Sequence, residues 1–373
     1  MTTQKPQDVK NQLLAKLTNG CLDFKSFGPN VHILISEFQN IDKFNDISTL
    51  ERIDYIQDCL RTLSEHCPSP LKDVLMEMIN TVVPSTVYAV QRIYDNDNQS
   101  IIDFQGRLPS ALQIKKVPKP ITSTLGHKFA LRKSKPDPRD KKMGLAHVNL
   151  PPKIDLRETG WLPDVLDQGN LGSCVAHGAS AALQFCLKKN KIKLFPPSRL
   201  YMYYTTRVYI EHISPSDDAG CEIRDVCKAI CNYHVCDEKY MPYDTSKYDV
   251  APSGTAVGAA RLHTRLQYCA VNLDLKSIKN TLVQNFPIIF GLQIYSSFEE
   301  EPAISTGYVP IPNKEKDQLL GGHAMLLIGY NDEEQMFTIR NSWGMVGQEG
   351  NFFIPYNYFM SEASDLWCIR VFA

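Results

Sequence analysis

The sequence has almost no net charge and no long apolar run. Its 40 Lys and Arg residues nearly balance 41 Asp and Glu residues, which leaves a formal charge of −1 over 373 residues. The chain as a whole therefore has no attraction for nucleic acid or an anionic membrane, and we expect neither as a partner. No stretch approaches the roughly 18 apolar residues that a membrane-spanning helix needs. With 43% hydrophobic and 22% charged residues, the composition also excludes a disordered chain.

The sequence also predicts no secretory signal. The first residues, MTTQKPQDVKNQ, contain no apolar core, so we expect an intracellular, cytoplasmic protein. Thiols stay reduced there, and the 11 cysteines are predicted to be mostly small buried apolar groups rather than a disulfide framework. A zinc site is the alternative for four cysteines that lack the close pairs of common zinc modules, namely Cys221, Cys227, Cys231 and Cys236. We expect no metal and no cofactor.

Three regions of different character follow one another along the chain. Residues 1–106 show apolar stripes at helical spacing and predict a helical N-terminal domain. Residues 107–149 are rich in proline and predict a linker, or a strap that lies over another surface. Residues 150–373 predict helices first and strands later, which is typical of an α+β body with two unlike halves.

The elements expected in residues 150–373 follow from good helix formers and from turn residues between apolar runs. The helices span Cys174–Lys188, with Ser173 as the N-cap, Ile223–Tyr233 and Leu275–Gln284. The strands span Ile288–Ile294, Ala324–Tyr330, Met336–Arg340 and Asn351–Ile354.

The strap region is also basic. A contact with an acidic partner or with nucleic acid is one interpretation of this charge, and a solvated basic linker is the other. We favour the solvated linker, because no aromatic residues alternate with the positive charges as a stacking platform would require. The basic residues are Lys128, Arg132, Lys133, Lys135, Arg139, Lys141 and Lys142.

A cysteine at the start of a predicted helix carries the clearest chemical signal. Cys174 follows a glycine-bearing loop, and the helix N-terminus stabilises a thiolate there, which makes the sulfur a nucleophile at neutral pH. His323 lies 149 residues later (323 − 174) at the mouth of a predicted strand and is the candidate base. Asn341 could hold the tautomer of that imidazole, with Trp343 shielding their hydrogen bond from water. Gln168 offers an amide donor that, with the Cys174 N–H, would form an oxyanion hole.

Two other interpretations compete at this site. Cys174 taken by itself would be interpreted as a buried structural thiol. A role as a nucleophile is favoured only because Gln168, His323 and Asn341 accompany it. His177 lies three residues after Cys174 on the same helix face and is a rival base. It would point along the helix rather than across a cleft, so we favour His323.

Three motifs occur in order along the chain: Gln-x5-Cys ending at Cys174, Gly-His-Ala around His323 and Asn-Ser-Trp-Gly from Asn341. Together they resemble the papain family of cysteine proteases, particularly the microbial and large-DNA-virus relatives made without a signal peptide. The resemblance covers about residues 135–373. It implies a papain-like two-lobed body, with a helical lobe, an antiparallel β lobe and a cleft between them, beside an all-α N-terminal extension.

The resemblance also implies roles for individual residues. Cys174 would be the nucleophile, His323 the base and then the acid, Asn341 the residue that orients His323, and Gln168 the second oxyanion donor. Gly220 would lie where the substrate backbone runs along the cleft. The implied function is that of a cysteine endopeptidase acting on polypeptide substrates, in a virion or host cytoplasm if the source is viral.

The sequence departs from the family pattern at several positions. Leu171 stands where the family usually has a disulfide cysteine, Val175 replaces the aromatic residue after the nucleophile, and Met345 lies where a second tryptophan is expected. Two other functions stay open: a catalytically idle papain-like binding protein, and a Cys-dependent acyltransferase such as a transglutaminase. Asn341 in place of an aspartate favours the protease over the acyltransferase.

The N-terminal region lacks the charged-aromatic helix pattern of the common family propeptides. We nevertheless hypothesise an autoinhibitory contact, in which residues 1 to about 130, together with the strap, cover the cleft until they are removed or displaced. The basis is a proline-rich basic linker that joins an unrelated bundle to the presumed start of the peptidase near Leu150.

Overall fold

The computed structural model describes residues 117, 120–123, 125–260 and 265–372. Contacts divide the chain into two units, one of residues 1–106 with 253–258 and the other of residues 107–252 with 259–373. The second unit contains every residue predicted for the site. The helical domain expected over residues 1–106 lies outside the described residues and stays a prediction.

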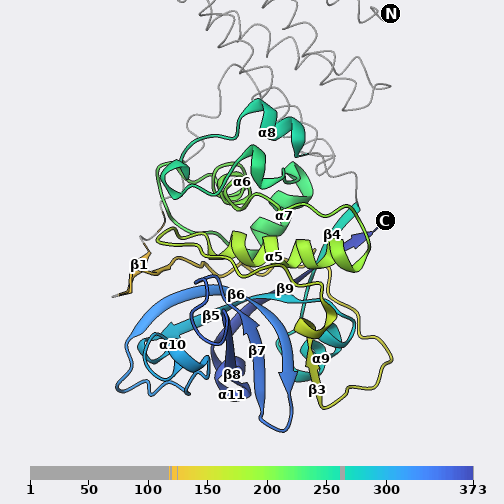
Figure 1. Cartoon of the computed structure of the whole chain (residues 1–373), viewed down its shortest axis with the longest axis vertical. Coiled ribbons are helices and arrows are strands. Elements are labelled where there is room, and N and C mark those ends of the chain that lie inside the picture. The colour runs from red at the N-terminus through yellow and green to blue at the C-terminus, as the bar shows by residue number, and fades with distance from the viewer. Residues whose placement is uncertain (1–116, 118–119, 124, 261–264, 373) are drawn as a thin grey trace, which may run out of the picture. The chain divides into compact units, whose positions relative to one another are not determined.

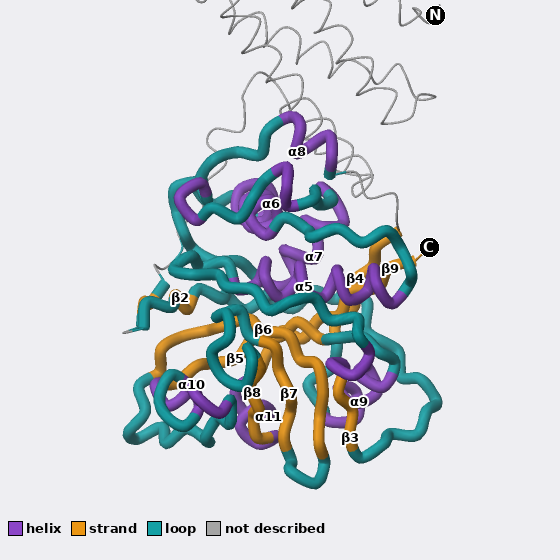
Figure 2. The backbone as a smooth tube through the Cα atoms, in the orientation of Figure 1, coloured by secondary structure: helices purple, strands orange, loops and turns teal. Residues whose placement is uncertain are grey.

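The helical layer of the second unit is built around α5 (Cys174–Lys189), which confirms the predicted helix and extends it by one residue. It is buried on nearly all sides, because small alanine side chains let it lie between the sheet and its neighbouring helices (Figure 2). Ser173 is the N-cap residue as predicted, but its hydroxyl caps no backbone N–H. That hydroxyl instead lies 2.7 Å from the Tyr243 hydroxyl.

The other helical segments are mostly short. Beside α5 lie α6 (Arg199–Tyr204), the π-helical turn η3 (Thr205–Ile210) and α7 (Ile223–Tyr233), the last as predicted. α9 (Leu275–Val283) ends one residue before its predicted end. The remaining segments are η2 (Leu156–Thr159), η4 (Glu238–Tyr240), η5 (Thr245–Lys247), α8 (Gly254–Ala259), η6 (Ser296–Phe298), α10 (Ala303–Thr306) and α11 (Tyr356–Glu362).

An antiparallel seven-stranded sheet forms the second layer, with the strand order β4-β9-β5-β6-β7-β8 and β3 paired to β6. The two layers confirm the predicted α+β, papain-like body with one helical and one antiparallel β lobe (Figure 1). The strands are β3 (Lys153–Asp155), β4 (Arg265–Ala270), β5 (Ile288–Tyr295), β6 (Leu319–Asn331), β7 (Met336–Arg340), β8 (Asn351–Pro355) and β9 (Ala363–Phe372).

All four predicted strands are present, and β6 is longer than expected at its start. His323 therefore lies inside β6 rather than at its mouth. The sequence analysis missed β9, which follows α11 without an intervening turn residue. The boundary falls within Ser361–Asp365, which contains neither glycine nor proline to mark it in the sequence.

The strap runs between the two layers (Figure 1). Its first described part is a two-strand ladder of β1 (Ile121–Thr122) and β2 (Lys128–Phe129). Beyond β2 the strap forms parallel bridges from Arg132 to Glu222 and from Lys142 to Ala270. The region between the lobes is therefore filled by a segment of the chain itself.

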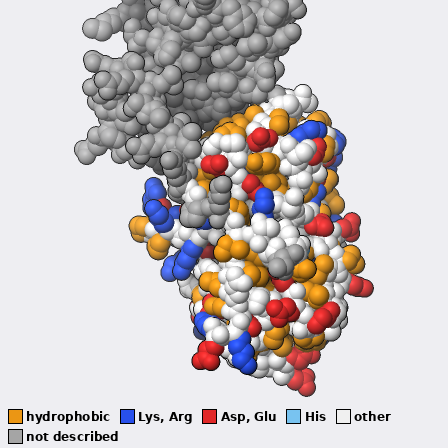
Figure 3. All heavy atoms as spheres, turned by 90° about the vertical axis from the view of Figure 1, so that its left-hand side faces the viewer, with side chains coloured by type: hydrophobic (Ala, Val, Ile, Leu, Met, Phe, Trp, Pro, Cys, Tyr) orange, Lys and Arg blue, Asp and Glu red, His pale blue; other side chains and the backbone are white. Residues whose placement is uncertain are grey.

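No described helix is long and apolar enough to cross a membrane. The face shown in Figure 3 carries both basic and acidic side chains on its described part.

Candidate active site

Cys174 lies at the first position of α5 with none of its surface exposed. Its sulfur is hydrogen-bonded by the backbone N–H of Ala324, the residue that follows His323 on β6. The sulfur also lies near the N–H groups of Val175 and of Cys174 itself. The helix start and the strand are thus held against each other at the thiol, although the two residues are far apart in sequence.

His323 is oriented by Asn341 at the end of β7. Its Nε2 lies 2.8 Å from Asn341 Oδ1, in a fully buried contact. Trp343 stacks on the imidazole with ring centroids 5.0 Å apart and shields this hydrogen bond, as the sequence predicted. Nδ1 of His323 is buried and has no hydrogen-bond partner among the described residues. An imidazole tied at Nε2 and unpaired at Nδ1 has one nitrogen left for proton transfer.

Gln168 is fully buried in the loop that leads to Cys174. Its side-chain oxygen accepts from the Ser342 hydroxyl at 2.6 Å, and its Nε2 donates to Leu171 O at 2.9 Å. The Gln168 N–H also donates to Ser342 O at 2.9 Å. Gln168 is therefore anchored to the residue next to Asn341, so the four predicted site residues belong to one connected set of contacts.

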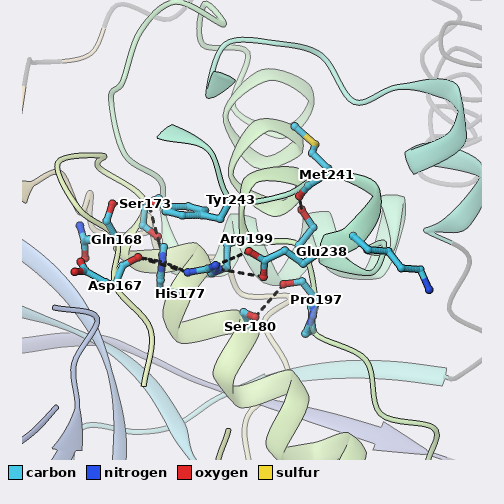
Figure 4. A network of polar contacts seen from close by, with 12 residues as sticks. Asp167, Gln168, Ser173, His177, Ser180, Pro197, Arg199, Glu238, Met241 and Tyr243 are labelled. Atoms are coloured by element: carbon cyan, nitrogen blue, oxygen red, sulfur yellow. Dashed lines mark hydrogen bonds and ion pairs between the residues drawn. The ribbon is translucent and has the colours of Figure 1, made fainter. Parts of the chain in front are cut away.

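The rival base, His177, lies in a different network, beneath the Gln168 loop (Figure 4). Its Nδ1 lies 3.0 Å from Ser173 O, and its Nε2 lies 3.1 Å from Arg199 Nη1. Nε2 also lies 3.3 Å from Asp167 O. Because Arg199 can only donate and is the nearer partner, we assign Nε2 as the acceptor and Nδ1–H as the donor of a neutral ring. Burial, together with the Arg199 charge, lowers the pKa of His177 to about 3. His177 is a structural link of the loop, and both of its nitrogens are occupied.

The same network also contacts the loop that contains Gln168 through Tyr243. Arg199 forms an ion pair with Glu238 and lies over the Tyr243 ring, 4.2 Å from its centroid. Tyr243 donates its hydroxyl to Gln168 O at 2.8 Å. The segments that contain Arg199 and Tyr243 resemble the family's helical half in sequence, but the sequence assigned no role to Arg199, Glu238 or Tyr243, because that role arises only from the contacts of the folded chain.

The strap covers this site. Phe129, 4% exposed, packs edge-on against His323 with ring centroids 5.8 Å apart. His127 stacks on Trp343 at 4.0 Å and its Nδ1 lies 2.6 Å from Glu299 Oε1. The side chains of residues 127 and 129 thus cover the imidazole and its tryptophan.

The strap backbone follows the cleft closely. The N–H of Leu131 donates to Gly322 O at 3.0 Å, and that of Arg132 donates to Cys221 O at 3.3 Å. Gly220 adopts a φ of +66°, and a Cβ added there would lie 1.8 Å from Ala130 O. Only glycine allows so close an approach in that conformation. Gly220 was expected where a substrate backbone runs, and the strap backbone runs there.

Two of the seven basic strap residues contradict the favoured solvated-linker interpretation. Lys128 Nζ lies 2.6 Å from Asp218 Oδ2, and Arg132 forms an ion pair with Glu211. The acidic partner is therefore the body of the same chain, which sequence patterning did not show because the partners are 90 and 79 residues away. The other five, including Arg139 with its side chain 81% exposed, are exposed as expected.

Metal-ligating groups do not gather around the four cysteines once weighed as a zinc site. Within the described residues, the one group close enough to hold a metal consists of Glu211, Glu222 and Asp225. Arg132 of the strap points its guanidinium at two of these carboxylates. The described cysteines are free thiols, all buried except the half-buried Cys231.

Burial disfavours the charged forms of both Cys174 and His323. It raises the pKa of the Cys174 thiol to about 11. It also lowers the pKa of His323 to about 4, against a smaller opposite effect of the Asn341 hydrogen bond. At a pH between these two pKa values, Cys174 is a thiol and His323 a neutral imidazole. They do not form the thiolate–imidazolium pair that makes a cysteine reactive.

Alkylation of Cys174 in the full chain is therefore expected to rise steeply with pH. Below a pKa of about 11, the thiolate fraction grows about tenfold for each pH unit, so capture by iodoacetamide should follow that slope from pH 7 to pH 10. Mass spectrometry of the peptide that contains Cys174 measures the rate of alkylation at each pH. A flat profile around neutral pH would show that the thiolate is already formed under the strap.

Comparison with known proteins agrees with this geometry. The family model for papain family cysteine proteases matches residues 150–359. The chain belongs to the papain family of cysteine proteases. An uncharacterised peptidase C1-like protein of Acanthamoeba polyphaga mimivirus is 36% identical over an alignment of 278 residues, and the match covers 67% of this chain and 88% of that protein. The viral branch named from the motifs is thus among its relatives.

Solved structures of papain-like proteases share the fold. The crystal structure of xylellain, a cysteine protease from Xylella fastidiosa, matches with a TM-score of 0.60 and 32% identity, over 70% of this chain and all of that one. A cathepsin B-like protein of Giardia intestinalis is 25% identical over 226 residues, 55% of this chain and 68% of that protein. The papain-like assignment made from three short motifs is confirmed.

Proposed function

We propose that this chain hydrolyses peptide bonds of polypeptide substrates through an acyl-enzyme on Cys174. In the first step His323 Nδ1 takes the thiol proton, and the sulfur attacks the peptide carbonyl carbon. The carbonyl oxygen becomes an oxyanion, which the N–H of Cys174 and the amide of Gln168 stabilise. The C–N bond then breaks, and His323 delivers its proton to the leaving amine.

The second half of the cycle releases the acyl group. Water gives a proton to His323 and adds to the thioester carbon, and the C–S bond breaks as the acid product leaves. The protonated imidazole then lies beside the thiolate again, ready for the next substrate. Asn341 holds the imidazole in the required tautomer throughout, and Trp343 keeps water from that hydrogen bond.

One observation supports this proposal most directly. His323 is bonded at Nε2 to Asn341 and unpaired at Nδ1, while the residue after it, Ala324, is hydrogen-bonded to the Cys174 sulfur. A purely structural histidine would have both nitrogens satisfied when fully buried, as His177 has. The unpaired nitrogen is explained by proton exchange with the neighbouring thiol.

Cleavage within a chain, rather than at its ends, is the finer part of the proposal. The strap passes the site as a continuous segment, from His127 on Trp343 to Ser134, whose N–H donates to Asp365 at 3.0 Å. Polypeptide therefore extends in both directions from the site. A cleft with room for chain on both sides favours an endopeptidase.

We further propose that the strap holds the enzyme latent and is not cut by it. The leaving amine must lie near His323, its proton donor, so the acyl side of a substrate lies toward Gly220. A substrate therefore runs from the Gly220 side to the Trp343 side, while the strap runs from Trp343 to Gly220. The strap's peptide bonds therefore face Cys174 in the reverse direction. Residues 127–134 of the strap cover the site of the presumed peptidase body over residues 150–373.

Mass spectrometry of a peptide library distinguishes the three candidate functions. We expect the full chain to produce fragments with new N-termini slowly, and a peptidyl epoxide inhibitor to stop the reaction with one adduct per chain. An idle binding protein would give no fragments and no adduct. An acyltransferase would attach a supplied primary amine, such as dansylcadaverine, in preference to water. Either of these results would contradict the peptidase assignment.

A further inference from the structure

The Arg132 side chain of the strap is held in a pocket made of acceptors alone. Its Nη2 bonds to the Glu211 carboxylate and lies 3.1 Å from Gly220 O, and its Nε lies 3.3 Å from Ala219 O. Its Nη1 lies 3.7 Å from Glu222 Oε1. We call this set of two carboxylates and two carbonyls the guanidinium pocket. A planar, five-donor guanidinium matches such a set better than the point charge of a lysine does.

The acceptors of the pocket all belong to the body. The Glu211 side chain is completely buried, and its second oxygen accepts from the Glu222 N–H at 2.7 Å. One oxygen is thereby fixed by the body, and the other is directed at the guanidinium. Ala219 and Gly220 present their carbonyls from the same segment that borders the cleft.

An empty pocket would be costly for the folded chain. A buried carboxylate needs a compensating charge or else takes up a proton. Burial raises the pKa of Glu211 to about 7 even with Arg132 in place, and the neighbouring Asp225 adds to the rise. A cation must therefore replace Arg132 when the strap leaves, if Glu211 is to stay ionised near neutral pH.

The pocket lies on the acyl side of the site. Phe129 packs on His323, which protonates the leaving amine, whereas Arg132 lies three residues further along the strap, at Gly220 and Cys221. A substrate that occupies the cleft in place of the strap would bring one of its own acyl-side residues to this pocket. Because the strap runs in the opposite direction, the position of that residue must be found by experiment.

From this geometry we propose that the guanidinium pocket is a specificity subsite, which selects substrates with an arginine on the acyl side of the cleaved bond. Arg132 occupies the subsite in the latent chain, in the way a substrate arginine would after displacement. The inference rests on the proposed peptidase function and adds a substrate class to it.

The test uses the full chain with its strap loosened and the pocket emptied, Phe129→Ala with Arg132→Ala. Fluorogenic peptides carry one arginine at the second, third or fourth residue on the acyl side, each matched by a peptide with neutral citrulline there. At one position we expect kcat/KM to be at least about tenfold higher for arginine, as for other charge-assisted hydrogen bonds. Adding Glu211→Gln should bring the ratio of kcat/KM for the arginine peptide to that for the citrulline peptide close to one. Glu222→Gln, expected to lower it several-fold, provides a second variant if the Glu211 change prevents folding.

Glu362→Gln is the matched control, since Glu362 pairs with Lys314 outside the cleft, and it should leave the ratio unchanged. Equal hydrolysis of the two peptides at all three positions, or a ratio that Glu211→Gln leaves intact, would overturn the subsite.

A binding assay separates this result from the peptidase proposal itself. Fluorescein-labelled arginine and citrulline peptides are titrated against the same loosened chain carrying Cys174→Ala, and fluorescence anisotropy is read. Tighter binding of the arginine peptide without hydrolysis by the chain that keeps Cys174 would overturn the peptidase function and retain the pocket. Hydrolysis of the arginine and citrulline peptides at equal rates would retain the peptidase function and overturn the pocket. No binding of either peptide would count against the pocket.

Discussion

Replacing Cys174 with alanine is expected to abolish peptide hydrolysis, with a loss of about 10⁴-fold or more. The substitution removes the atom that forms the acyl-enzyme, and groups that act as one catalytic unit cannot compensate for the loss of the nucleophile. The fold should survive, because a thiol and a methyl group are similar in size and Cys174 is fully buried. Covalent capture by a peptidyl epoxide, followed by intact-mass measurement, reports the same loss without requiring turnover.

Cys231→Ala is the control for this experiment. Cys231 is the most accessible of the described thiols and lies on α7, away from the site contacts of Cys174. It should label and hydrolyse as the unaltered chain does. If the adduct persists in Cys174→Ala but disappears in Cys231→Ala, the reactive thiol is Cys231 on α7. That result would contradict the proposed role of Cys174.

Loosening the strap should have the second largest effect, in the opposite direction. Phe129→Ala is expected to raise hydrolysis of a small fluorogenic peptide by the full chain about 100-fold. Full burial of a phenylalanine contributes about 1.5–3 kcal/mol, which corresponds to roughly one to two powers of ten in the population with an open cleft. Phe129 is 4% exposed and packs on both His323 and Trp343, so most of that contribution should be lost.

Leu125→Ala provides the matched control for the strap, since Leu125 belongs to the same segment but is 52% exposed. It should change the rate by less than about twofold, as surface substitutions usually do. Equal rates for the unaltered chain and Phe129→Ala would argue against latency. The strap would then be a structural part of the body that leaves the cleft accessible by another route.

The candidate site was the most predictable part of this protein. Cys174, His323, Asn341 and Gln168 were identified from three short motifs, and helix α5 and strand β7 were found from local patterns close to their actual bounds. These features are encoded locally, because capping position, helix formers and turn residues act within a few residues. The Ser173 hydroxyl shows the limit of such reasoning: its position was right, yet Tyr243, 70 residues away, took its hydrogen bond.

The strap shows what local patterns could not provide. Its basic residues looked like a solvated run, and five of the seven are exposed. Whether Lys128 and Arg132 were exposed depended on acidic residues far along the chain, and Glu211 carries no motif that would mark it as a partner. Charge patterning reports composition, whereas ion pairing depends on which surfaces the fold brings into contact.

Sequence alone indicated the family, because its three motifs recur in order along the chain, and it named the candidate residues for the proposed chemistry. Tertiary structure decided that the chain's own strap fills the cleft, that the thiol beneath it is uncharged, and that Arg132 lies against a buried glutamate. Each of these depends on desolvation and on contacts between segments distant in sequence, which arise only when the lobes and the strap pack together.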